Sequence, residues 1–413
     1  MARALGHYPS IRVSDEQVSA AAAGINLART AYLPRLDALG QVNRATRNNV
    51  FGLILPNSVI PSISGPVLGT NGLNSVWGTT VGALVSWEPF DFGLRNANVS
   101  VAEASRRRAD AAAVRTRYEV TVLTADSFLT LLAAEETLHA ADAAVERTHV
   151  LNQVVGALVK SELRPGADAS RAQAEQAMAE TQRIQAQQAV DVARITLAQF
   201  IGLAPAAVAA NPGPLLGPPP EPTEATNVSR HPLALEQNAA VEESNAREHA
   251  LNRTYFPKFY LQGTSYARGE GNTGPNTQNW ALGFTATFPV FDFASIRARK
   301  QIEAHRERSE EARYQQVLTE LNSNVARARA VLHAARLIAR NTPVQLEAAR
   351  QAQKQATARY RAGLSDVVNV ADAERLLTQA EIDDALARLS VWRALLSAAA
   401  AQGDLQPFLD RTQ

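Results

Sequence analysis

The sequence contains no cysteine among its 413 residues. This absence excludes disulfide bonds, thiolate metal sites, cysteine nucleophiles and a lipid anchor on an N-terminal cysteine. Aromatic residues make up only 6% of the chain, whereas hydrophobic residues together make up 46%, and alanine is conspicuous along long stretches. Such a composition is typical of long packed helices rather than of a thick mixed core.

An excess of charge of either sign is also missing. The chain carries 41 basic and 40 acidic residues, a net charge of +1, so no bulk field favours nucleic acid and we expect no nucleic-acid partner. The seven histidines show no metal-ligand spacing, and no nucleotide-binding loop or catalytic triad is evident. We therefore expect no cofactor, no metal and no enzymatic activity.

Long hydrophobic runs are lacking as well. The uncharged stretch 48–87 is broken by Pro56, Pro61 and Pro66, so it does not predict a transmembrane helix. Met1 leads directly into the first repeated motif without an apolar segment. We therefore expect the natural start to lie upstream, with a signal peptide there or already removed.

The chain contains the same succession of motifs twice. Residues 32–36 (Y-L-P-R-L) recur at 255–259 (Y-F-P-K-F), 87–93 (W-E-P-F-D-F-G) at 288–294 (F-P-V-F-D-F-A), and 163–166 (L-R-P-G) at 360–363 (Y-R-A-G). The offset falls from 223 to 201 to 197 residues, which indicates a duplicated, domain-sized element. We expect a first repeat over 1–203, a proline-rich linker over 204–230 and a second repeat over 231–413.

Each copy predicts a helix, a strand, a loop, a strand, a very long helix, a sharp turn and a last helix. The first helix is expected over 14–31 with Ser14 as its N-cap, and a loop from the end of the strand 36–44 to about Trp77. The long helix after Gly93 would approach about 100 Å. Asn341-Thr342-Pro343 predicts a kink or restart in the second long helix. The expected strands are 36–44, 79–89, 258–266 and 279–288.

The second strand of each copy alternates large apolar side chains with small or hydroxylated ones, which is typical of a membrane-spanning barrel strand. A soluble hairpin packed on a core is the alternative. Four strands cannot close a barrel, so two chains would give eight strands and three would give twelve. The residues expected to face the membrane are Val81, Val85, Trp87, Trp280, Leu282, Phe284 and Phe288.

The long helices carry two neighbouring apolar rows, as in Tyr118, Val122, Ala125 beside Leu123 and Phe128. Two rows predict neighbours on both sides, as in a wall of helices. An ordinary helical bundle fits the same periodicity. Basic clusters follow the second strand of each copy; solvated helix faces are favoured over lipid phosphates or a tunnel lumen. They comprise Arg106, Arg107, Arg108, Arg297, Arg299, Lys300, Arg306 and Arg308.

The order, spacing and duplication of these motifs resemble the TolC-type outer-membrane efflux family over nearly the whole chain. The resemblance implies a mostly α fold with a small β part: a long helical-hairpin tunnel, and four strands per chain in a trimeric twelve-stranded transmembrane barrel. It implies a bacterial outer-membrane location with a large periplasmic portion. The implied partners are two further copies, outer-membrane lipid, a periplasmic adaptor (membrane fusion) protein and, through the adaptor, an inner-membrane pump or ABC exporter.

The resemblance also assigns roles by position. Adaptor-docking helix tips would be formed by Arg164, Pro165, Gly166, Ala167, Arg361, Ala362, Gly363, Leu364 and Ser365, and glycine suits a helix reversal that needs a left-handed residue. The periplasmic pore constriction would involve Tyr360, Asn369 and Asp372. Because Asn369 is uncharged, we expect weak cation selectivity. Asp168 and Asp366 are further acidic candidates near the tips, although such residues are more often solvated helix N-caps.

The predicted function is a passive exit duct for small molecules or proteins, in a tripartite efflux pump or a type I secretion system. The alternative from the residues is a soluble periplasmic coiled-coil scaffold or adaptor without a pore. An unrecognised enzyme is a third class, which would require a pocket of clustered titratable groups.

Overall fold

The computed structural model describes residues 2–46, 75–211, 215, 227–270, 277–290 and 292–410. Met1, most of the loop predicted between Arg44 and Trp77, and most of the predicted linker 204–230 lie outside the described residues. Contacts divide the chain into two compact units. Unit 1 comprises Met1–Glu16, Ala111–Glu236 and Tyr314–Gln413, and unit 2 comprises Gln17–Asp110 and Gln237–Arg313.

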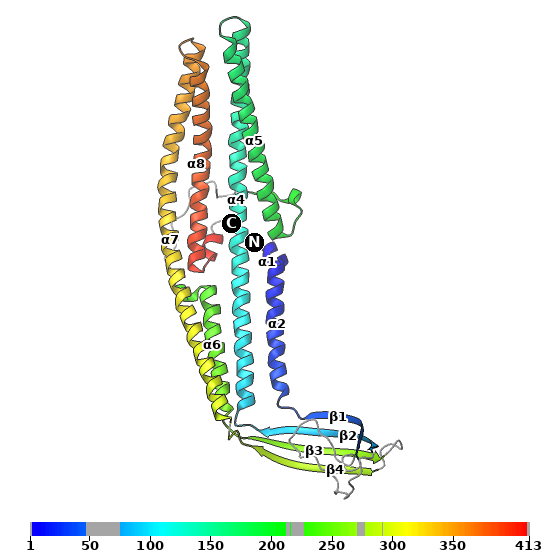
Figure 1. The fold of residues 1–413 in the computed structure, drawn as a ribbon. Helices are drawn as coiled ribbons and strands as arrows, with labels where there is room; N and C mark the ends of the chain where they lie inside the picture. The colour runs from blue at the N-terminus through cyan, green and yellow to red at the C-terminus, as the bar shows by residue number, and fades with distance from the viewer. Residues whose placement is uncertain are drawn as a thin grey trace. The chain divides into compact units, whose positions relative to one another are not determined.

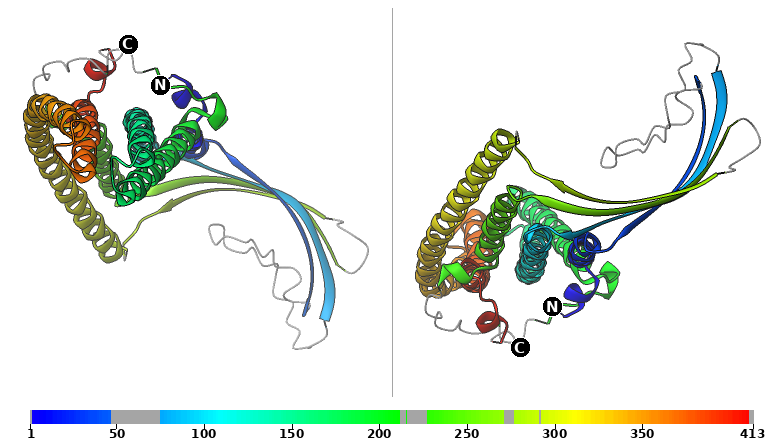
Figure 2. Two further views of the ribbon diagram at one scale, coloured as in Figure 1. Left: turned by 90° about the horizontal axis from the view of Figure 1, so that it is seen from above. Right: turned by 90° about the horizontal axis from the view of Figure 1, so that it is seen from below.

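Unit 2 contains one four-stranded antiparallel sheet, with the strands side by side in the order β1-β2-β3-β4 (Figure 1). The strands curve along their length (Figure 2). All four predicted strands are confirmed, each within a few residues of its expected ends. Their bounds are Arg35–Thr46 (β1), Ser75–Phe90 (β2), Lys258–Glu270 (β3) and Thr277–Thr287 (β4).

Helical segments of unit 2 come from α2 (Pro9–Thr30), α6 (Pro232–Arg253) and the first turns of two long helices. Glu243 of α6 is buried and accepts hydrogen bonds from Arg108 (3.1 Å) and Arg247 (2.5 Å). Part of the predicted basic cluster is therefore neutralised by α6 rather than free to bind an anion.

Unit 1 is helical. It contains α1 (Ala2–His7), α5 (Gly166–Ile201), α8 (Val367–Gln402), α9 (Gln406–Leu409) and the greater part of α4 (Leu94–Lys160) and α7 (Phe293–Arg361). Short 3₁₀ turns lie at Pro205–Ala207 and Val228–Arg230. In this unit α4 lies beside α5, and α7 beside α8 (Figures 1 and 2). The largest hydrophobic cluster is centred on Trp392, which is 2% exposed and contacts the Phe408 ring edge-on at 6.3 Å.

The predicted N-cap of the first helix is wrong, and of the two alternatives predicted at Pro343 the restart is wrong. The helix α2 begins at Pro9, whose fixed φ suits a first helical position, and the Ser14 hydroxyl donates inside the helix to the Ile11 carbonyl (2.7 Å). The helix α7 does not restart at Pro343 but continues through it. The Thr342 hydroxyl donates to Asp384 of α8 (3.0 Å).

Candidate functional site

The two helical hairpins of unit 1 reverse direction in the same way. In the second hairpin Gly363 has φ +77°, and the Leu364 amide donates to the Arg359 carbonyl (2.9 Å). In the first hairpin the left-handed residue is Glu162, with φ +60°, and the Leu163 amide donates to the Leu158 carbonyl (2.9 Å). The expectation of a left-handed glycine is confirmed at Gly363. At the first hairpin it is wrong, because Gly166 is the first residue of α5.

These hairpins correct the predicted alignment of the repeats. Glu162 precedes Gly363 by 201 residues, α5 and α8 both have 36 residues, and their left-handed C-caps are Gly202 and Gly403. The offset between corresponding residues of the two repeats is therefore 201 from the ends of β2 and β4 to the ends of α5 and α8. It does not fall to 197. With this alignment Asn369 is the counterpart of Asp168.

Arg164 joins the turns of the two hairpins. The Arg164 guanidinium donates to the carbonyls of Tyr360 (2.9 Å) and Ser365 (3.3 Å), and it lies 4.5 Å from the centre of the Tyr360 ring. The Tyr360 hydroxyl donates to Asp168 of α5 (3.5 Å). Burial, and then the nearby Asp168 carboxylate, raise the pKa of Tyr360, so the phenol stays protonated at neutral pH.

Tyr360 is 1% exposed and belongs to a hydrophobic cluster at the tips, together with Leu151, Val155, Ala172, Val367 and Val370. Its side chain therefore packs between the helices, and within one chain its contribution is to hold the hairpins together. By contrast Asn369 and Asp372 are exposed near the start of α8. Asp372 lies 3.5 Å from Arg375, whose guanidinium also donates to Glu175 of α5 (2.7 Å).

The other predicted tip residues surround these contacts. Pro165 is the N-cap of α5 in an extended conformation. Asp366 occupies the same position for α8 without a side-chain capping bond. Leu364 is 70% exposed. Of the remaining predicted docking residues, Gly166 and Ala167 begin α5, Arg361 ends α7 and Ala362 lies in the turn after it.

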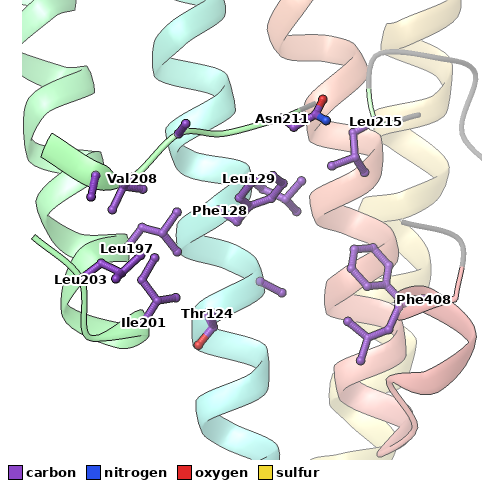
Figure 3. Close-up of a pocket in the computed structure, with 14 residues that line it drawn as sticks. Thr124, Phe128, Leu129, Leu197, Ile201, Leu203, Val208, Asn211, Leu215 and Phe408 are labelled. Atoms are coloured by element: carbon purple, nitrogen blue, oxygen red, sulfur yellow. The ribbon is translucent and has the colours of Figure 1, made fainter. Parts of the chain in front are cut away.

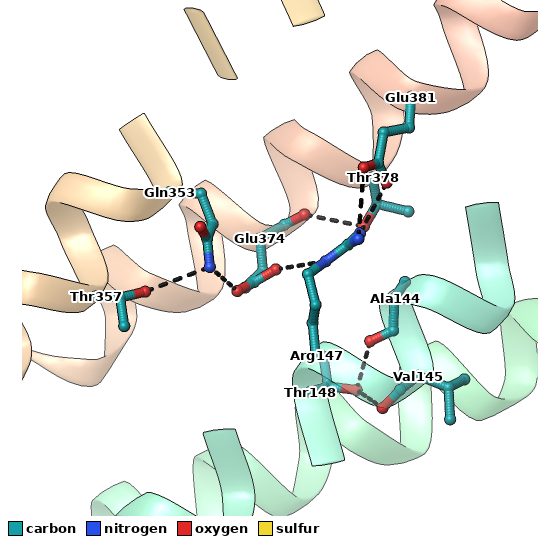
Figure 4. A network of polar contacts seen from close by, with 9 residues as sticks. All are labelled: Ala144, Val145, Arg147, Thr148, Gln353, Thr357, Glu374, Thr378 and Glu381. Carbon is teal, nitrogen blue, oxygen red and sulfur yellow. Dashed lines mark hydrogen bonds and ion pairs between the residues drawn. The ribbon is translucent and has the colours of Figure 1, made fainter. Parts of the chain in front are cut away.

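A polar network farther from the tips joins three helices (Figure 4). Arg147 of α4 donates to Glu374 of α8 (3.0 Å), to Thr378 (3.0 Å) and to Glu381 (3.0 Å). Gln353 of α7 donates to the second carboxylate oxygen of Glu374 (2.6 Å). The Glu374 side chain is only 8% exposed, so its charge depends on these partners.

The sheet of unit 2 has one apolar face. Trp280, Leu282 and Phe284 are 80%, 68% and 66% exposed, and the strand register places Leu282 and Phe284 opposite Gly263 and Leu261 of β3. The other face carries polar side chains, such as Gln262 and Thr264. Every predicted membrane-facing residue lies on the apolar face or continues it beyond the end of β4. The full set is Val81, Val85, Trp87, Trp280, Leu282, Phe284 and Phe288.

A buried ion pair fixes the end of β2. Asp91 accepts from the Arg95 side chain (3.0 Å), and Arg95 also donates to the Ala31 carbonyl (3.3 Å) and lies 4.7 Å from the Tyr32 ring centre. Trp87 donates to the Tyr32 carbonyl (3.1 Å). Burial raises the pKa of Asp91, but bonds from the amide and guanidinium of Arg95 outweigh it and hold that pKa below its usual value.

An apolar cavity of about 340 Å³ lies in unit 1 (Figure 3). Its lining includes Phe128, Leu129, Leu197, Val208 and Phe408, and no lining residue is titratable. It therefore offers no titratable acid or base. Among the described residues no group of three or more potential ligands could hold a metal ion. No helix in the described ranges is long and apolar enough to cross a membrane.

The duplicated hairpins and the amphipathic sheet agree with a comparison against known families. The sequence profile of the outer membrane efflux proteins matches residues 1–203 and 228–404. The chain belongs to the outer membrane efflux protein family. Membership in this family makes it an outer-membrane efflux channel, a transport duct and not an enzyme.

Individual proteins are also similar to this chain. Protein CyaE of Bordetella pertussis is 26% identical over 346 residues, which cover 81% of this chain and 68% of CyaE. The open-state MtrE outer membrane channel of Neisseria gonorrhoeae superposes with a TM-score of 0.77 at 20% identity, covering 98% of this chain and 88% of MtrE. For the CmeC outer membrane channel of Campylobacter jejuni the TM-score is 0.79 at 14% identity, covering 99% and 87%. These structures share the fold of this efflux protein.

Two contact groups were not predicted from the sequence. Asp91 lies in the repeated W-E-P-F-D-F-G motif, and Arg95 lies two residues after it. The signal for this contact was an aspartate shortly before a long helix, because a carboxylate there can accept hydrogen bonds from backbone amides of the first turn. The Arg147–Glu374 pair joins residues 227 positions apart, and no local pattern marks it.

Proposed function

We propose that three copies of this efflux protein form one exit duct, each giving four strands to a closed twelve-stranded barrel in the outer membrane. The observation that carries this proposal is the amphipathic sheet with two open edges. Among the described residues β1 pairs only with β2, and β4 only with β3. Lipid provides no hydrogen-bond partners for an open edge, so another chain must pair with it.

The two faces of the sheet support the same arrangement. The exposed apolar side chains, led by Trp280, Leu282 and Phe284, would face the acyl chains. The opposite face, with Gln262 and Thr264, would line a water-filled lumen. Eight strands are about the practical minimum for such a barrel, which four strands cannot reach.

The helices would continue the duct through the periplasm as a tunnel, with the two hairpins of each chain at its end. The hairpin turns, with exposed Leu364 and Leu163, would receive a periplasmic adaptor protein. The bonds of Arg164 to Tyr360 and Ser365 would hold the end narrow. Asn369 and Asp372 would then ring the constriction. Because Asn369 is uncharged, only Asp372 of these two would bring a carboxylate to the constriction, and we expect weak selection among cations.

Transport through the duct would be passive, and the energy would come from the inner-membrane partner. With a drug pump the cargo would be small molecules, and with an ABC exporter it would be a protein. Both assemblies need the same outer duct, so the adaptor decides which one this protein serves.

The test uses the natural absence of cysteine. One cysteine replaces Gln41 in β1, and a second replaces Asn279, Ala281, Gly283 or Thr285 in β4, one at a time. If neighbouring copies pair β1 with β4, one of these variants should oxidise to covalent dimers and trimers in the outer membrane, while Gln41→Cys alone should not. Native mass spectrometry should then give a complex near three times 44.4 kDa, present only with detergent. A detergent-independent monomer or dimer would instead favour the soluble scaffold.

A further inference from the structure

A cavity of about 880 Å³ lies in unit 2, between the start of α4 and the end of α6. Its lining combines two kinds of side chain. Phe90, Phe92 and Phe256 supply aromatic rings, and Arg253 and His249 supply cationic or hydrogen-bonding groups. Such a combination suits an amphiphilic ligand better than a wholly polar or wholly apolar one.

The aromatic rings connect the cavity to the apolar face of the sheet. Phe92 stacks on Phe256 at 5.2 Å, and its ring lies 6.1 Å from that of Phe259. Phe259 in turn stacks on Phe284 at 5.8 Å. The cavity is therefore continuous with the surface that the proposed function assigns to lipid. Aromatic side chains concentrate at the level where acyl chains meet headgroups.

The charges of the cavity leave a positive excess. Arg107 lies 3.5 Å from Glu242, so these two lining residues largely neutralise each other. Arg253 and His249 are exposed, and none of the described residues forms an ion pair with either of them. A guanidinium matches the geometry of a phosphate better than any other side chain does.

We propose that this cavity binds one phospholipid of the periplasmic leaflet per chain. The phosphodiester would lie against Arg253 and His249, and the acyl chains would pass over Phe92 and Phe256 onto the apolar face of the sheet. A free phosphate would leave the aromatic wall in water, and a purely apolar molecule would leave Arg253 without a partner. This inference rests on the proposed insertion of the sheet in the outer membrane.

The experiment counts bound lipid by native mass spectrometry. Detergent-purified, delipidated protein is titrated with 1-palmitoyl-2-oleoyl-phosphatidylglycerol. We expect saturation at one lipid per chain, and at least about tenfold weaker binding by Arg253→Gln/His249→Gln, which removes the charge-assisted contacts. The matched control is Arg350→Gln/His305→Gln, which makes the same two exchanges at exposed positions outside the cavity lining. It should bind as the wild type does.

The competing occupant is tested with glycerol 3-phosphate, which carries the phosphate without acyl chains. Displacement of the lipid at equal concentration would show a free-phosphate site and overturn the proposal, as would unchanged lipid binding by the double variant. In either case a trimer that still conducts ions would leave the proposed function standing. If no detergent-dependent trimer forms, the proposed function fails, and the lipid site fails with it.

Discussion

Removing the arginine of the buried network should destabilise unit 1 strongly. In Arg147→Met the Glu374 carboxylate keeps only Gln353 as a partner, although its side chain is 8% exposed. Breaking a buried pair by removing one partner costs about 3–5 kcal/mol, and because Arg147 is 22% exposed we expect the lower end, about 3 kcal/mol.

A double-mutant cycle separates the free energy of the Arg147–Glu374 interaction from the effect of each substitution on side-chain packing. Glu374→Leu alone leaves Arg147 with Glu381 and Thr378, so it should cost about 1–2 kcal/mol. In Arg147→Met/Glu374→Leu neither charge remains unpaired at this position. The double variant should therefore be more stable than Arg147→Met, with a coupling energy of about 2 kcal/mol.

The assay is urea-induced loss of helical circular dichroism at 222 nm, with the midpoints converted to free energies of unfolding. The control is Arg183→Met, which removes an exposed partner of Glu180 on α5 and should leave the midpoint unchanged. If Arg147→Met unfolded no more readily than this control, or if the two single effects added up in the double variant, Glu374 would not depend on Arg147.

Four further variants test other features. Glu162→Gly should raise the free energy of unfolding by about 1 kcal/mol in the same urea assay, because φ +60° is unfavourable for glutamate. Gly82→Ala should lower the trimer yield from membranes, because its Cβ would lie 2.5 Å from a Tyr side chain, whereas Gly40→Ala, with nothing within 4 Å, should not. The wild-type protein should lose thermal stability as the pH falls below about 4, and Asp91→Asn should not show this loss. The reason is that the pKa of Asp91 is lowered in the folded protein. Its charge therefore stabilises the fold above the ordinary carboxyl pKa, and this stabilisation is lost as the pH falls through the lowered pKa. Arg164→Ala should increase single-channel conductance in planar bilayers, because two carbonyl contacts between the hairpins disappear; an unchanged conductance would show that the tips are held by other contacts.

The strands and long helices were predictable because their signals are local. Alternation along β2 and β4, and the absence of proline over α4, each depend on neighbouring residues only. The register between β2 and β3 could not be predicted, since it joins residues of the two repeats.

The wrong predictions concern positions where the residue type alone does not determine the backbone conformation. Pro343 predicts a kink or a restart, but α7 does not restart there, because packing against α8 outweighs a single lost hydrogen bond. Gly166 predicts the left-handed residue of the first reversal, but Glu162 adopts that conformation. Tyr360 was identified by position, whereas its burial and its contact with Arg164 depend on the packing of two hairpins.

The open edges of the sheet also concern how the protein is made. A single copy entering the membrane would carry two rows of unsatisfied amides, β1 and β4 being paired on one side each among the described residues. Insertion and trimer formation would then be one step, whose rate rises steeply with the number of copies present. Before that step the apolar strands would tend to aggregate. Cells that produce little of this protein should therefore lose a disproportionate share to periplasmic proteases, and channel number should rise faster than expression.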